Sequence, residues 1–274
     1  MPSNDARTNH IISNGMNPTK KVLVVANWKM NPSRADDAKA LFSDTQKVAH
    51  KLKNVETIVC PPVVYLAMLG DMVTDRNCVL GAQDTFWEHE GSYTGEVSPD
   101  MIFSTKARYI IIGHSERRAQ GDTDAIIAKK VHATLQFPLI PIICIGEEER
   151  DDEGHYLKTV RNQIRSVIEG RSREDIARIV FTYEPVWAIS SQHQKPCSPE
   201  ECKDMIALMR REIADITGSS ELAHEILILY GGSVDESNVD DFLTTGTASG
   251  VLVGRASLDA KTFGQVLTVA EKSL

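Results

Sequence analysis

The sequence predicts an α/β fold of the (β/α)8-barrel class, because eight short runs of apolar, often β-branched residues alternate with longer amphipathic segments. The runs are apolar throughout rather than at alternate positions, which is typical of parallel strands buried on both faces. The pattern repeats about every 30 residues, as expected for one strand and one helix. The eight runs are Val22–Asn27, Thr57–Cys60, Cys78–Ala82, Tyr109–Gly113, Leu139–Ile145, Ile179–Tyr183, Ile226–Tyr230 and Gly250–Gly254.

The segments between the runs have helical periodicity. Arg34–Leu52 carries its apolar residues on one stripe, and Asp124–Leu135, Tyr156–Ile168, Pro199–Ile216 and Ser257–Leu274 behave similarly. Eight strand–helix units in about 255 residues match the size of such a barrel, roughly 250 residues. A doubly wound open sheet is the structural alternative, but no glycine-rich fingerprint follows the first run, so the barrel is favoured.

The chain divides into two parts of different character. Residues 1–19 are polar and lack a signal-peptide hydrophobic region, so we expect a flexible N-terminal extension. Residues 20–274 show no Gly/Ser-rich linker and no break in composition. We therefore expect one (β/α)8-barrel domain over residues 20–274.

Composition excludes several classes of partner. The chain has 38 acidic and 30 basic side chains and a formal net charge of −8, which argues against a broad surface for nucleic acid or an anionic membrane. No run reaches the roughly 18 apolar residues of a membrane helix. The five cysteines form no C-x-x-C pair, so we expect small buried hydrophobic residues in a reducing, cytoplasmic compartment.

Reactive polar residues follow three of the predicted strands, where barrels of this class build their active sites. Asn27 and Lys29 follow the first run, and alternation of an extended chain would place them on the same side. His114 stands at the turn into a helix, where the helix dipole favours neutral imidazole, able to donate a hydrogen bond to a carbonyl oxygen. Glu184 ends the sixth run between apolar neighbours, which suits a general base. A solvated lysine, a structural histidine and an exposed glutamate are the alternatives.

Glycines follow the last two predicted strands. Tyr230-Gly231-Gly232-Ser233 comes after the seventh run, and Gly254-Arg255 ends the eighth. Glycines before a helix let backbone N–H groups approach a phosphate closely, and this is the frequent phosphate-binding position in barrels. The sequence therefore predicts a phosphorylated carbonyl substrate.

Taken in order, these segments resemble the triosephosphate isomerase family, from about Lys21 to the C-terminus. The motifs that carry the resemblance are Ala26–Asn31 (ANWKMN), Thr94–Pro99 (TGEVSP), Gly113–Arg118 (GHSERR), Tyr183–Ile189 (YEPVWAI) and Tyr230–Val234 (YGGSV). The resemblance implies an eight-stranded TIM barrel that interconverts dihydroxyacetone phosphate and D-glyceraldehyde 3-phosphate in glycolysis and gluconeogenesis. It implies no metal and no organic cofactor.

The resemblance also assigns roles to single residues. Glu184 is the base, neutral His114 the electrophile, and Lys29 and Asn27 steady the enediolate. Glu116 resembles the family's acid beside the site. The phosphate ligands implied are Ser233 and the amides of Gly232 and Gly254.

Two positions depart from the family's pattern. Residues 185–197 resemble its mobile lid, but both tip glycines are replaced and two residues are inserted, so that Ser190 stands where a glycine amide binds phosphate. We expect a lid that closes with altered rate or geometry. Arg255 replaces another phosphate-binding glycine. Either its amide faces the phosphate while the side chain faces solvent, which we favour, or its guanidinium clamps a second anionic group.

Gln83-Asp84 and Gly91–Val97 resemble the loop by which one family subunit reaches its partner's site, where Thr94 would brace Asn27 and Lys29. Burial of Tyr93 in such an interface favours a homodimer over a free polar loop. Two other functions stay open at this point, namely a paralogous isomerase acting on a tetrulose phosphate and a catalytically idle barrel kept as an interaction scaffold. A metal-dependent epimerase is disfavoured because no His/Asp ligand set follows the runs.

Overall fold

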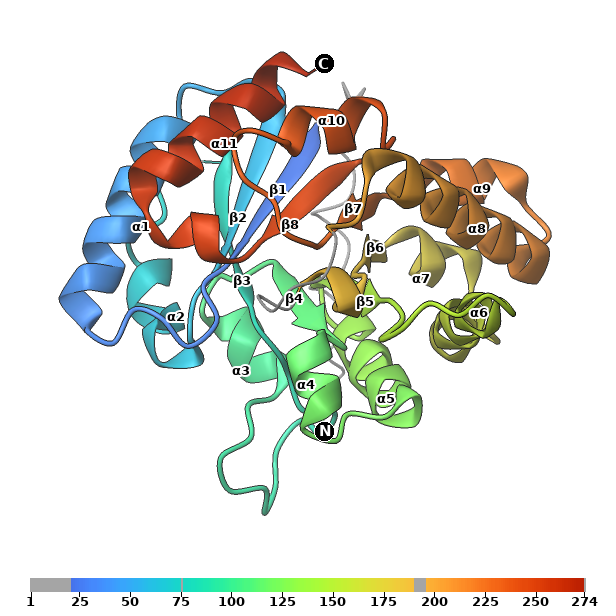
Figure 1. Ribbon diagram of the computed structural model, residues 1–274. Helices are drawn as coiled ribbons and strands as arrows, with labels where there is room; N and C mark the ends of the chain where they lie inside the picture. The colour runs from blue at the N-terminus through green and yellow to red at the C-terminus, as the bar shows by residue number, and fades with distance from the viewer. Residues whose placement is uncertain (1–20, 75, 190–195, 274) are drawn as a thin grey trace.

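The computed structural model describes residues 21–74, 76–189 and 196–273. Eight parallel strands pair in chain order and close into a barrel, with the last strand beside the first (Figure 1). The predicted fold class is therefore confirmed. The strands are β1 (Val22–Asn27), β2 (Val55–Cys60), β3 (Cys78–Ala82), β4 (Tyr109–Ile112), β5 (Ile140–Ile145), β6 (Val180–Tyr183), β7 (Ile228–Tyr230) and β8 (Gly250–Val253).

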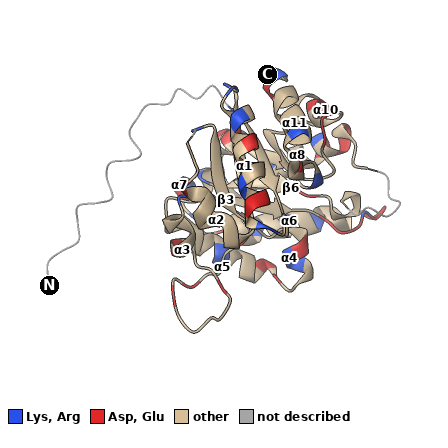
Figure 2. Cartoon of the chain, turned by 90° about the vertical axis from the view of Figure 1, so that its left-hand side faces the viewer, with Lys and Arg blue, Asp and Glu red and all other residues tan. Residues whose placement is uncertain are grey.

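Helices surround the barrel and carry charges of both signs on their outer surfaces (Figure 2). Among the described residues we find no helix with the length and apolar character of a membrane span. The α-helices are α1 (Ala35–Ala49), α2 (Val63–Gly70), α3 (Pro99–Ser104), α4 (Ser115–Ala119), α5 (Asp124–Leu135), α6 (His155–Ile168), α7 (Arg173–Ala177), α8 (Pro199–Thr217), α9 (Ser220–Glu225), α10 (Val239–Thr244) and α11 (Ala260–Lys272), and the 3-10 turns are η1 (Val186–Ala188) and η2 (Arg255–Leu258).

The long helices agree with the predicted ones, whereas the short ones were missed. Five- and six-residue helices such as α4 are too short to show a helical period, and α2 is apolar almost throughout. The predicted helix Ser257–Leu274 begins later than expected, because the side chain of Asp259 accepts a hydrogen bond from the Thr262 amide and caps α11 there.

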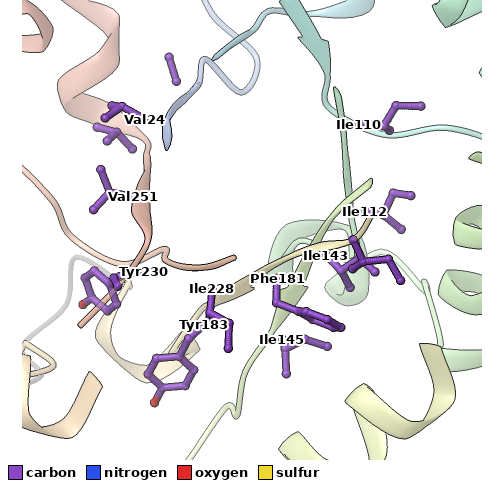
Figure 3. Packing of buried hydrophobic residues seen from close by; sticks show 14 of the residues in the cluster. Val24, Ile110, Ile112, Ile143, Ile145, Phe181, Tyr183, Ile228, Tyr230 and Val251 are labelled. Atoms are coloured by element: carbon purple, nitrogen blue, oxygen red, sulfur yellow. The ribbon is translucent and has the colours of Figure 1, made fainter. Parts of the chain in front are cut away.

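Alternation along the strands divides the buried apolar residues into two clusters. One lies between the barrel and its helices, and Figure 3 shows members such as Val24, Ile112 and Phe181 on the outward faces of the strands. The other fills the barrel interior and includes Leu23, Val25 and Val180. Inward positions therefore recur at every second residue, and the next inward position at each strand's carboxyl end lies at the barrel mouth.

This register places the candidate residues. Asn27 continues the inward series of Leu23 and Val25, and Glu184 continues that of Val180 and Thr182. Because side chains alternate along a strand, burial of the preceding inward residues directs both side chains toward the barrel mouth. The five cysteines are all free and buried, as expected.

Candidate active site

A cavity of about 850 Å³ opens at the carboxyl ends of the strands. Its walls come from both halves of the chain, so that residues more than 200 positions apart meet around one space. Of the candidate residues, the cavity is lined by Asn27, Lys29, His114, Glu184, Gly232, Ser233, Gly254 and Arg255.

Glu184 is held in the mouth of the barrel with only 3% of its surface exposed. One carboxylate oxygen accepts a hydrogen bond from the Ser115 amide at 3.0 Å, and the other accepts one from the Ser115 hydroxyl at 2.8 Å. Its backbone lies against Gly146, where an added Cβ would stand 1.8 Å from the Glu184 carbonyl oxygen. The carboxylate is thus buried in a fixed position and still faces the cavity.

His114 is the N-cap of α4 and is 5% exposed. Its Nδ1 accepts a hydrogen bond from the Glu116 amide at 3.2 Å, so in the neutral imidazole the proton lies on Nε2. Nε2 lies 3.2 Å from a carboxylate oxygen of Glu184. A proton donor and a proton acceptor therefore meet at the cavity wall.

Lys29 and Asn27 both line the cavity, but not through extended alternation. Lys29 has a φ of 51°, in the left-handed region, so the expected extended geometry is wrong at this residue. The Asn27 side-chain oxygen accepts a hydrogen bond from the Lys29 amide at 3.0 Å, and the Lys29 ammonium lies 2.7 Å from the Glu116 carboxylate. The turn places a partly exposed cation in the cavity that His114 and Glu184 also line, paired with a carboxylate that lies 3.8 Å from His114 Nδ1.

The glycine turns after β7 and β8 line the same cavity. At Gly232 an added Cβ would stand 2.1 Å from the Tyr230 hydroxyl, so a side chain there would displace the tyrosine. At Gly254 a Cβ would stand 3.7 Å from the Cε of Lys29, which shows how close the lysine passes to this turn. Ser233 donates to the Ala188 carbonyl at 3.4 Å, and Arg255 is exposed at the start of η2.

A second carboxylate beside Glu184 was missed by the sequence reasoning. Glu147 is 1% exposed, and one of its oxygens accepts hydrogen bonds from the Tyr183 hydroxyl at 2.8 Å, the Trp187 indole at 2.9 Å and Arg150 at 3.0 Å. Burial and the neighbouring Glu147 charge raise the pKa of Tyr183 well above its usual value. The sequence signal was present, since Glu147 follows the fifth run by two residues, close to the position at which Glu184 follows the sixth.

Comparison with known proteins identifies the family. A family model described as triosephosphate isomerase matches residues 22–270. The chain belongs to the triosephosphate isomerase family. Curated triosephosphate isomerases similar to it include those of Dictyoglomus thermophilum (35% identity, 90% of this chain and 99% of the relative), Rhodopirellula baltica (38%, 92% and 98%) and Nitrosococcus oceani (39%, 88% and 95%).

Triosephosphate isomerase activity follows from this near-complete match, so the chain interconverts the two triose phosphates. The predicted family, fold and enzyme class are confirmed. Ser190, the predicted phosphate ligand in the lid, lies outside the described residues, as does the expected extension 1–19.

The loop expected to reach a partner subunit of the isomerase is exposed in the single chain. It extends between β3 and α3 away from the barrel in both Figure 1 and Figure 2. Thr94 is exposed, and Tyr93 is 45% exposed although its ring lies 4.7 Å from that of Phe86. Neither residue lines the cavity of its own chain.

Proposed function

We propose that Glu184 is the base of this isomerase and His114 its electrophile. The observation that carries the proposal is the 3.2 Å separation of the Glu184 carboxylate and His114 Nε2 in the wall of one cavity. A carbon acid next to a carbonyl needs a base at the carbon and a hydrogen-bond donor at the oxygen. Glu184 and His114 line the same cavity and would supply the base and the donor respectively.

The reaction proceeds by three balanced proton transfers. Glu184 takes a proton from the carbon beside the carbonyl of dihydroxyacetone phosphate, and the electron pair passes to the carbonyl oxygen, which Nε2–H of His114 stabilises as the enediolate forms. His114 then shuttles a proton between the two oxygens, and Glu184 returns its proton to the neighbouring carbon to give D-glyceraldehyde 3-phosphate. Lys29 supplies positive charge beside the developing anion, and Asn27 fixes the Lys29 amide.

We propose that Glu116 pairs with the Lys29 ammonium while the site holds no substrate. Its carboxylate is 56% exposed and pairs with the Lys29 ammonium, so an incoming phosphate can replace one exposed anion by another at small cost. Ser233 and the amides of Gly232 and Gly254 are proposed phosphate ligands, because the two glycines carry no side chain that would cover their backbone N–H groups. Arg255 is proposed to contribute its amide, with the exposed side chain facing solvent.

A homodimer is proposed for the assembly. The exposed large apolar residues lie on neighbouring elements that follow the first three strands, and a second copy would bury them. The partner's loop would then bring Thr94 against Asn27 and Lys29. These exposed residues are Met30, Val63, Val64, Tyr93, Met101 and Phe103.

Disrupting this surface tests the dimer. Val64 is 77% exposed, so Val64→Glu should leave the monomer folded while placing a charge in the proposed interface. We expect sedimentation velocity to show a dimer for the wild type and a monomer with reduced activity for the variant. A monomeric, fully active wild type would contradict the proposal.

We further propose a cytoplasmic location, which the five free, buried cysteines support, and a single catalytic domain over residues 20–274, which the family match over residues 22–270 supports. The assay that tests the function couples turnover of D-glyceraldehyde 3-phosphate to a dehydrogenase that consumes dihydroxyacetone phosphate. A tetrulose phosphate is offered in competition. Folded protein that turns over neither substrate would identify an idle scaffold, and preference for the tetrulose would identify the paralogous reaction.

A further inference from the structure

Gln83 occupies the inward position at the carboxyl end of β3. It continues the series of Val79 and Gly81, as Asn27 and Glu184 continue theirs. By register alone it therefore belongs to the rim from which the proposed catalytic side chains project, although it does not line the cavity itself.

Both hydrogens of one amide group tie Gln83 to the two preceding strands. Its Nε2 donates to the carbonyl oxygen of Lys29 at 2.8 Å and to that of Cys60, the last residue of β2, at 2.8 Å. The opposite orientation of the amide would place its oxygen against two carbonyl oxygens, so this arrangement is the one that satisfies the network. A single side chain thus joins the ends of β1, β2 and β3.

Lys29 needs such a restraint. A left-handed backbone is disfavoured for a residue with a Cβ and persists only where its surroundings hold it. The Asn27 side chain holds the Lys29 amide, and Gln83 holds the Lys29 carbonyl. Both peptide groups around the left-handed residue are therefore fixed, and with them the direction in which the ammonium leaves the backbone.

The neighbouring Asp84 fixes the segment of Gln83 to α4. Its carboxylate lies 2.8 Å from the ammonium of Lys130, which is 2% exposed, and 2.9 Å from the guanidinium of Arg117. Arg117 follows Glu116, the residue that pairs with the Lys29 ammonium. The backbone of Lys29, through Gln83 and Asp84, and its ammonium, through Glu116, are thus both held by contacts to α4.

We propose that Gln83 is a positioning residue that sets Lys29 for binding the anionic substrate; this inference rests on the proposed role of Lys29. Without the two hydrogen bonds, Lys29 can leave the left-handed conformation, and its ammonium is no longer held beside Glu116 at the cavity. Loss of these hydrogen bonds should therefore weaken the binding of phosphorylated ligands as well as lower the stability of the fold.

The test compares Gln83→Met with Gln46→Met. Gln46 is buried where Gln83 is half-buried, and its side chain donates to the Met72 carbonyl at 3.0 Å and accepts from the Thr74 amide at 3.1 Å, away from the cavity. Both variants replace an amide by an apolar chain of the same length. We expect both to lower Tm, but only Gln83→Met to raise KM, and Kd for phosphoglycolate, by about tenfold.

A double-mutant cycle shows whether Gln83 acts through Lys29. In the Lys29→Met background, Gln83→Met should change the Kd for phosphoglycolate by less than about twofold, because the charge it positions is absent. A tenfold effect in both backgrounds, or an unchanged Kd in folded Gln83→Met, would overturn the inference. If Gln83→Met does not fold, Gln83→Glu replaces it, since a carboxylate donates to neither carbonyl, and unchanged affinity in that variant would equally overturn it.

The two proposals fail in different ways. Absence of turnover in wild-type protein would refute the proposed function, whereas the binding cycle uses no turnover. Normal turnover together with an additive cycle would refute the positioning role of Gln83 and leave the assignments of Glu184 and His114 intact.

Discussion

Glu184→Asp tests how closely the site depends on the position of one carboxylate. The substitution removes one methylene and draws the carboxylate back by about 1.5 Å, one carbon–carbon bond. In the native chain the carboxylate stands 3.2 Å from His114 Nε2 and 2.8 Å from the Ser115 hydroxyl, so the retreat takes it out of reach of both. The negative charge remains in the cavity, but the proton acceptor no longer meets the substrate carbon.

A displacement of about 1 Å costs about a hundredfold in rate when the reacting groups are otherwise intact, which corresponds to about 2.7 kcal/mol in the barrier. We therefore expect kcat of Glu184→Asp to fall about a hundredfold, while KM changes by less than about threefold because the phosphate contacts are retained. The coupled isomerase assay measures both constants.

Glu212→Asp is the matched control. Glu212 is 6% exposed and lies 2.7 Å from Arg165 on the outer layer of helices, so shortening it disturbs a buried carboxylate without touching the cavity. Its kcat should equal that of the wild type. If Glu184→Asp retained more than a third of the wild-type kcat, or Glu212→Asp lost as much, the assignment of Glu184 as the base would be wrong.

Three other substitutions probe separate parts of the account. His114→Gln keeps an amide donor but cannot shuttle a proton, so kcat should fall about a hundredfold or more with little change in KM; a normal kcat would rule out the electrophile role. Arg255→Gly should change KM less than about fivefold, since an exposed charge contributes under about 1 kcal/mol, and a larger rise would show that the guanidinium clamps the substrate. Burial raises the pKa of the Cys197 thiol from 9.0 to about 12, so its unfolded form ionises first and the free energy of unfolding should fall as pH rises through that range. Between pH 8 and pH 10, the free energy of unfolding measured with urea should fall less steeply for Cys197→Ala than for the wild type. Parallel pH dependences would show that the Cys197 thiol does not cause the fall.

The strands could be predicted from the sequence because their signal is local. A fully buried parallel strand is apolar at every position, so each run marks its strand to within about two residues. The residues just beyond the runs were predicted for the same reason, since Asn27, His114 and Glu184 are polar side chains that end apolar segments.

What escaped prediction depends on contacts between distant segments. Ser115 holds Glu184 from another strand's loop, and Gln83 holds Lys29 across two strand ends. The sequence placed Ser115 in a family motif and Gln83 in the expected partner-reaching loop, but neither position in the chain indicates which distant residue the side chain contacts. The left-handed turn at Lys29 was missed because propensity disfavours it, and only the surrounding hydrogen bonds stabilise it.

Isomerisation in deuterium oxide tests the central claim most directly. If Glu184 removes the proton and returns it through an enediolate, the proton on the carboxylate exchanges with solvent during turnover. Proton NMR of the product should then show deuterium on the carbon that receives the proton, and Glu184→Gln should abolish both turnover and incorporation. Full turnover with no deuterium in the product, together with retained turnover in Glu184→Gln, would indicate direct hydride transfer between the carbons and would contradict the account.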